Sequence, residues 1–519
     1  MTIKEKIGHL FSPAAFIHDT EENIEAMERL IQEQHIGGIT FFHSRQSAAA
    51  NFEQRQEVLN YDQTLKKLIK LINRYQLLAK TPLLISIDAE FGLAMRIEET
   101  PQYPYAISLG ALPEEQIRLV REVGYRIGKD LKQCGIHVNF APVADINSNP
   151  DNPVIGYRSF GTDKQKVSKF AWAMYEGMRQ AGLQGCYKHF PGHGDTDVDS
   201  HLGLPIIHKS KNELLKEELY PFAEGISQGV EMIMVGHLAV PALSGGKNIP
   251  ASLSKEVING LLQNEMGFQG IVVTDALNMK SVSDMYPTPG QLELVALEAG
   301  NDLLCFSEQV EAAIDLIAER LHEDRIELSY QKIMRLKEKL GVSHVLPQSP
   351  IHFDWENHAA FNEKLAKHYI KEIESNKNAD LLDCRSFAKV SVFSPLFNPF
   401  FNEIDNFQST PSFEIHTAQD VAWKDLEQFE NILIALYLPS AKPVNHFGMD
   451  PQVIKKIINM TTGKNCQLYL FGNPLALNGI IGKNSICKIV CAYQNFEPVQ
   501  KMAALHFLDE LDQGMDFQM

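Results

Sequence analysis

The chain has 519 residues, of which 44% are hydrophobic and 22% are charged. This length excludes a disulfide-stabilised miniprotein and predicts several domains of roughly 100–200 residues each, and the composition is that of a folded protein. The formal net charge is −17. Because so acidic a chain repels phosphate backbones, we expect no nucleic-acid partner.

The seven cysteines are an odd number and show no CxxC spacing, which predicts buried thiols in a reducing compartment. No apolar run approaches the ~18 residues of a membrane-spanning helix. The opening MTIKEKIGHLFSPAAF lacks the apolar core and cleavage site of a signal peptide. We therefore expect no membrane span and a cytoplasmic location, or a periplasmic one if a leader has been removed. The oligomeric state is not predicted.

Short apolar runs alternate with amphipathic stretches over residues 1–335, which is typical of strand–helix units around a parallel sheet. Eight strands are predicted, at Ile7–Phe11, Ile36–Phe42, Leu83–Asp88, His137–Val143, Gly185–His189, Met232–His237, Gly270–Asp275 and Asn301–Phe306. The clearest helices are predicted at Thr20–Gln34, Pro113–Cys134, Asp163–Ala181 and Ser254–Met266. This number and order favour a (β/α)₈ barrel, with a doubly wound sheet as the alternative.

A second, smaller domain is predicted after the barrel. Residues 336–359 mix charge, proline and histidine without periodicity, which is typical of a linker. Over residues 360–519, the segments FENILIALYLP, CQLYLFGNP and ICKIVCAY have the pattern of buried strands, and Pro451–Met460 that of a crossover helix. We therefore expect an α/β sandwich domain there.

Polar residues close several of the predicted barrel strands. In this fold, active sites gather where the strands end and the βα loops begin. The residues placed in this way are Asp88, Asp145, Lys188, His189, His237 and Asp275. The pattern predicts that they converge at one end of the barrel.

The densest group of reactive side chains lies between Lys188 and His201. One interpretation is a metal site, with ligands drawn from His189, His193, Asp195, Asp199 and His201. A lysine beside the cluster and a Pro-Gly loop in place of a helical face argue against it, so we predict no metal and no cofactor. A solvated loop rich in turn residues is the unreactive alternative.

A second interpretation is acid–base chemistry. On an extended loop Asp199 and His201 project to the same side, so the carboxylate can orient the imidazole and make it a proton donor. Asp275, at the end of a buried strand, is suited to attack a sugar anomeric carbon. The alternative for Asp275 is the N-cap of the following ALNMKSV segment.

Nine segments over residues 5–310 resemble glycoside hydrolase family 3, and within it the β-N-acetylglucosaminidases of peptidoglycan turnover. They are KIGHLF, IGGITFF, IDAEFGLAMR, FAPVADI, GYRSFGTD, KHFPGHGDTDVDSHLGLP, MIMVGHLAVPAL, GFQGIVVTDALNM and AGNDLLCF. The resemblance implies Asp275 as nucleophile and His201 with Asp199 as the acid–base dyad. It also implies a set of residues that bind the sugar hydroxyls, namely Asp88, Arg96, Arg158, Lys188 and His189.

One segment departs from the family pattern. The family commonly reads DQEGGRVxR where this chain reads DAEFGLAMR from Asp88 to Arg96. The two outer residues keep their spacing, whereas the inner glycine and arginine are lost and Phe91 stands nearby, either as a stacking surface or as an ordinary core aromatic.

The resemblance implies a retaining exo-β-N-acetylglucosaminidase that removes terminal N-acetylglucosamine from muropeptide fragments, so the expected partner is a small carbohydrate. Within the family, a β-glucosidase, a xylosidase or an N-acetylglucosamine phosphorylase is the alternative. Outside it, the alternatives are a metal-dependent amidohydrolase on the same barrel and a sugar-binding protein without turnover.

Overall fold

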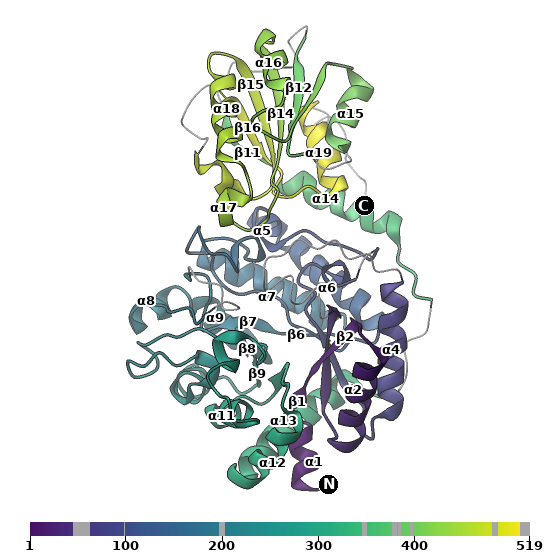
Figure 1. Ribbon diagram of the computed structural model, residues 1–519, viewed down its shortest axis with the longest axis vertical. Coiled ribbons are helices and arrows are strands. Elements are labelled where there is room, and N and C mark those ends of the chain that lie inside the picture. The colour runs from purple at the N-terminus through teal and green to yellow at the C-terminus, as the bar shows by residue number, and fades with distance from the viewer. Residues whose placement is uncertain are drawn as a thin grey trace. The chain divides into compact units, whose positions relative to one another are not determined.

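The computed structural model describes residues 1–44, 63–97, 99–196, 203–344, 350–375, 381, 386–394, 398–479 and 486–508. The chain divides into two compact units (Figure 1). The first comprises residues 1–103, 115–149 and 158–353, and the second comprises residues 104–114, 150–157 and 354–519. In the described ranges, every helix is too short or too polar to span a lipid bilayer.

The first unit is built on parallel strands. They are β1 (Phe11–Ser12), β2 (Ala14–His18), β3 (Gly38–Ser44), β4 (Leu84–Ile87), β5 (Val138–Asn139), β6 (Gln184–Gly185), β7 (Tyr187–Phe190), β8 (Met232–Val235), β9 (Ile271–Thr274) and β10 (Leu304–Cys305). Three ladders run β10–β1, β2–β3–β4–β5–β6 and β7–β8–β9. Single bridges, Val143 with Lys188 and Val273 with Leu303, link them in the order of a (β/α)₈ barrel.

Helices follow the strands and lie outside them (Figure 1). They are α1 (Ile3–Gly8), α2 (Glu21–Glu33), α4 (Thr64–Leu78), α6 (Ile117–Gln133), α7 (Lys164–Gln180), α8 (Lys211–Lys216), α9 (Tyr220–Gln228), a π-helical segment (Glu256–Glu265), α10 (Lys280–Ser283), α11 (Gln291–Ala299), α12 (Val310–Arg320) and α13 (Glu323–Leu340). Their buried residues recur every three or four positions, as in α6, where Leu119, Val123, Ile127 and Leu131 face inward.

The four helices predicted in this region are confirmed, but the first predicted strand is wrong in part. Ile7 lies in the last turn of α1, which ends at Gly8, and the strand begins only at Phe11. Helix α1 forms because the Thr2 side chain accepts from the backbone N–H of Glu5 while the Glu5 carboxylate accepts from that of Thr2. Strand β2 was not predicted.

The second unit contains a six-stranded sheet in the order β11–β16–β15–β14–β12–β13. The strands are β11 (Lys371–Ser375), which is antiparallel to β16, and the parallel β12 (Ala388–Val392), β13 (Ser412–Ile415), β14 (Asn431–Tyr437), β15 (Asn465–Phe471) and β16 (Ile486–Cys491). The helices of this unit are α5 (Ala106–Gly110), α14 (Trp355–Tyr369), α15 (Pro399–Phe407), α16 (Ala422–Asp425), α17 (Val444–Phe447), α18 (Pro451–Thr461) and α19 (Glu497–Phe507).

Two short segments from the barrel part of the chain belong to this second unit. In the first of them, the backbone N–H of Tyr105 and the hydroxyl of Ser108 both donate to Oε1 of Gln494. The linker predicted over residues 336–359 overlaps the end of α13 and the start of α14.

Candidate active site

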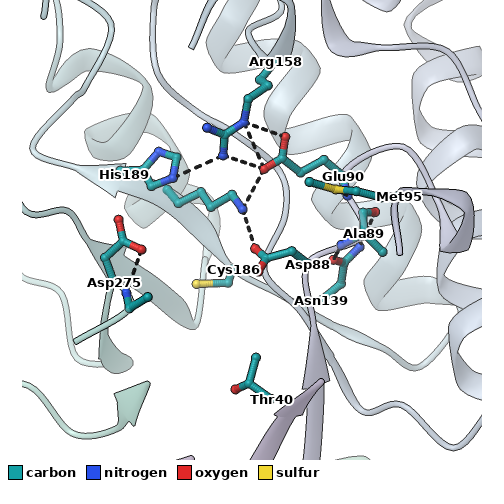
Figure 2. Close-up of polar contacts among 12 residues, drawn as sticks. Thr40, Asp88, Ala89, Glu90, Met95, Asn139, Arg158, Cys186, His189 and Asp275 are labelled. Carbon is teal, nitrogen blue, oxygen red and sulfur yellow. Dashed lines mark hydrogen bonds and ion pairs between the residues drawn. The ribbon is translucent and has the colours of Figure 1, made fainter. Parts of the chain in front are cut away.

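Charged side chains gather at the carboxyl ends of the barrel strands. Asp88 follows β4, Lys188 and His189 lie in β7, and Asp275 follows β9. Parallel strands place these positions at one end of the barrel, and Figure 2 shows Asp88, His189 and Asp275 around a common centre with Glu90 and Arg158.

Lys188 joins two carboxylates of this group. Its ammonium is 2.8 Å from Oδ1 of Asp88 and 2.8 Å from Oε1 of Glu90, and the residue is only 2% exposed. Burial opposes the charge on Lys188, but the two carboxylates outweigh it and raise the pKa of this lysine above its usual value. Lys188 therefore stays protonated and can donate to a bound ligand.

Arg158 binds the carboxylate of Glu90 through two nitrogens (Figure 2). Its Nη2 lies 2.7 Å from Oε1 and its Nε 2.9 Å from Oε2 of the carboxylate. Burial alone would raise the pKa of Glu90, but Arg158 and Lys188 hold it well below its usual range. The forked pair therefore fixes the plane of the guanidinium at the edge of the site.

Arg96 connects to the same group from the other side. Its Nη2 lies 3.6 Å from Oδ2 of Asp88, and its guanidinium carbon lies 3.9 Å from the ring centroid of Phe42. A planar cation over an aromatic face is a favourable contact. The stack orients Arg96 toward Asp88.

The imidazole of His189 is oriented by a buried carboxylate. Its Nδ1 lies 2.7 Å from Oδ2 of Asp145. This Oδ2 also accepts from the backbone N–H of His189, and Oδ1 of the same carboxylate accepts from the backbone N–H of His193. Nδ1 therefore carries the proton, and Nε2 faces Arg158 at 3.5 Å. Burial and the neighbouring His189 lower the pKa of His193 to about 4, so that His193 is neutral near pH 7.

Asp275 is held by the turn that follows β9. Its Oδ1 accepts from the backbone N–H of Ala276 at 2.8 Å, and buried His237 binds the carbonyl oxygen of Ala276 through Nε2 at 3.0 Å. Helix α10 begins only at Lys280, with Met279 at its N-cap. Asp275 is therefore not the N-cap of that helix.

Asp199 and His201 lie outside the described residues. Of the other metal candidates, His189 binds Asp145, His193 lies 2.9 Å from the Thr196 hydroxyl, and Asp195 pairs with Lys209 at 3.0 Å. In the part of the chain that is described, no three His, Cys, Asp or Glu side chains converge as ligands for a metal ion.

One chain of contacts connects all five predicted sugar-binding residues, which are Asp88, Arg96, Arg158, Lys188 and His189. The sequence analysis assigned no site role to Glu90, which links Lys188 to Arg158. Its position two residues after Asp88, just beyond a strand end, was the available signal. Asp145 and His237 were noted at strand ends, but their orienting contacts were not foreseen.

Fixed carboxylate acceptors beside fixed Arg and Lys donors can bind the vicinal hydroxyls of a sugar. Known proteins agree with this chemistry: residues 2–336 match the glycosyl hydrolase family 3 N-terminal domain. The chain is 30% identical over 498 residues to β-hexosaminidase A of Pseudoalteromonas piscicida, covering 88% of this chain and 78% of that one.

A solved structure extends the likeness to both units. A family 3 β-N-acetylglucosaminidase from Paenibacillus sp. str. FPU-7 aligns with a TM-score of 0.79 and 27% identity, covering 98% of this chain and 97% of that one. The β-hexosaminidase LpqI of Mycobacterium tuberculosis is 34% identical over 256 residues, covering 48% of this chain and 65% of that one. The protein is a glycoside hydrolase, and it belongs to glycoside hydrolase family 3.

Proposed function

We propose that the protein is a retaining exo-β-N-acetylglucosaminidase. The observation that carries this proposal is the position of Asp275 at the end of β9, at the same barrel end as the network of Asp88, Glu90, Lys188 and Arg158. A nucleophilic carboxylate next to a prearranged set of hydroxyl-binding groups is what cleavage of a terminal sugar requires. The relatives named as hexosaminidases support the choice of sugar.

In the first step, the Asp275 carboxylate attacks C1 of the bound sugar. The bond between C1 and the glycosidic oxygen breaks, and His201, oriented by Asp199, gives that oxygen a proton. The leaving group departs as an alcohol, and the sugar stays attached to Asp275 as a glycosyl ester.

In the second step, the neutral His201 takes a proton from water as the water oxygen attacks C1. The ester bond to Asp275 breaks, and the carboxylate is restored. Two displacements at the same carbon leave the product in the β configuration of the substrate.

The −1 subsite assigned to Asp88, Arg96, Arg158, Lys188 and His189 binds the hydroxyls of that sugar. Lys188 and Arg158 can donate to these hydroxyls, and Asp88 can accept from them. The chain's resemblance to enzymes of peptidoglycan turnover supports muropeptide fragments as the source of the terminal N-acetylglucosamine.

Release of nitrophenol from the β-N-acetylglucosaminide and the β-glucoside, side by side and with EDTA present, tests the reaction. We expect turnover of the N-acetylglucosaminide alone. Preference for the glucoside or xyloside would move the protein to another specificity of the family, and loss of activity with EDTA would indicate a metal-dependent hydrolase.

Two further readouts test the mechanism. Proton NMR of the fresh product should show the β anomer, and an α anomer would contradict the two-step displacement. In phosphate buffer the product should be free sugar, because water is the proposed acceptor. Formation of sugar 1-phosphate would identify a phosphorylase.

A further inference from the structure

The amino-terminal end of the barrel has a cavity that the catalytic reaction does not use. The cavity measures about 340 Å³, and its lining includes Thr81, Gln331, Arg335, Lys337 and Glu338. Thr81 lies just before β4, whereas Asp88 follows that strand. The cavity therefore lies at the opposite end of the barrel from Asp275, and its volume is within the range of about 300–1,000 Å³ usual for small-ligand sites.

Lys337, near the end of α13, is the unusual residue of this cavity. It is only 4% exposed, and among the described residues no group accepts a hydrogen bond from its Nζ. Two other lysines of the barrel differ, because Lys188 lies 2.8 Å from Asp88 and Lys332 lies 2.8 Å from Asp302. A buried ammonium without an acceptor is costly, so an anion that reached it would be bound with little competition from water.

Two buried histidines lie within reach of the charge of Lys337. His9, just before β1, is 1% exposed, and its Nδ1 has no hydrogen-bond partner among the described residues. Burial, and after it the charge of Lys337, lowers the pKa of His9 to about 3 and that of His137 to about 4. Both imidazoles are therefore neutral, and Lys337 carries the positive charge of this group.

The acidic groups near this end are already paired or exposed. Glu5 lies 3.1 Å from Lys80 and 3.5 Å from His35, and Glu338 is exposed to solvent. Arg335, also exposed, offsets the charge of Glu338 in the cavity lining, so the ammonium of Lys337 leaves the lining net positive. The field inside the cavity therefore favours a negative ligand.

We propose that the amino-terminal end of the barrel binds a small oxyanion, the carboxylate or phosphate group of a metabolite, through the ammonium of Lys337. Lys337 supplies the net positive charge of the cavity lining. The site is separate from the catalytic centre, so that the bound anion and the sugar do not compete.

Calorimetric titration with inorganic phosphate and, separately, with acetate tests this site in the full chain. The titrations are run in slightly acidic buffer with sodium chloride at matched ionic strength. We expect one molecule bound per chain, with a Kd at least about tenfold higher in Lys337→Met, a factor that corresponds to about 1.4 kcal/mol. The probe that binds more tightly identifies the headgroup.

Two variants serve as controls. Lys339→Met removes an exposed lysine of the same helix, which pairs with Glu231, and should leave the Kd unchanged. Lys337→Gln should weaken binding as Lys337→Met does, and both should hydrolyse substrate at the wild-type rate, which shows that they fold. Absence of binding of both probes to the wild type, or binding to the two Lys337 variants with the wild-type Kd, would overturn the proposal.

Discussion

The two ends of the barrel differ in whether their buried lysine has a carboxylate partner. At the carboxyl end, Lys188 has two carboxylates at 2.8 Å, and Arg158 forks onto Glu90. At the amino end, Lys337 is as deeply buried but has no acceptor among the described residues. A network of paired charges can bind a neutral polyol without a change in net charge, whereas an unpaired cation favours the binding of an anion.

The largest expected effect is at Asp275. Asp275→Ala should lower kcat by about four orders of magnitude or more, because the covalent step loses its nucleophile. Asp284→Ala, at an exposed position nine residues further on, is the matched control and should be nearly wild type. Sodium azide should restore turnover in Asp275→Ala as the α-glycosyl azide. Without such rescue, the loss of activity would not identify a nucleophile.

Glu90→Gln breaks the paired network while keeping its shape. It removes the carboxylate that Arg158 and Lys188 share, and a lost charge-assisted hydrogen bond costs about 1.5–3 kcal/mol. We expect kcat/KM to fall roughly 10- to 100-fold and the urea midpoint to decrease. Wild-type kcat/KM in this variant would show that Glu90 does not position the sugar-binding groups.

Arg96→Lys should have a smaller effect. The lysine keeps the charge near Asp88 but loses the planar stack on Phe42. Since such stacks contribute about 0.5–2 kcal/mol, KM should rise by about 2- to 30-fold with kcat little changed. A fall in kcat at constant KM would instead indicate that Arg96 acts mainly in the transition state.

The smallest effect on activity is expected at the amino end. Burial lowers the pKa of Lys337 from 10.5 to about 7, so between these pH values the unfolded chain binds the proton and the folded chain does not. The free energy of unfolding should therefore rise with pH across this window in the wild type. In Lys337→Met the rise should be smaller, with hydrolysis unchanged. Parallel pH profiles of stability would contradict the assigned burial of this ammonium.

Much of the barrel could be predicted because its strands carry continuous apolar runs and its helices have clear caps. Thr20 and Asp163 begin α2 and α7 where the sequence placed them, each accepting from a backbone N–H three residues on. The first strand was misplaced because a short apolar run such as IGHLF fits the end of a helix as well as it fits a strand. Strands as short as β1 and β5 leave little periodic signal.

The site was predictable where polar residues close strands, as with Asp88, Lys188 and Asp275. The link from Glu90 to Arg158 joins residues 68 positions apart, and nothing in the local pattern reveals such a pairing. Lys337 was not singled out, because in α13 it reads as one of several lysines in a charged helix. Only its depth in the fold distinguishes it from Lys339, which pairs with Glu231.

The most direct test of the proposed mechanism is to trap the glycosyl enzyme. A fluorinated N-acetylglucosaminide that reacts quickly and is released slowly should inactivate the protein with one sugar bound per chain. Mass spectrometry of the digested protein should then find the sugar on the peptide that contains Asp275. A label on another carboxylate, such as Asp88 or Glu90, would contradict the account, as would an unlabelled enzyme that releases the α anomer.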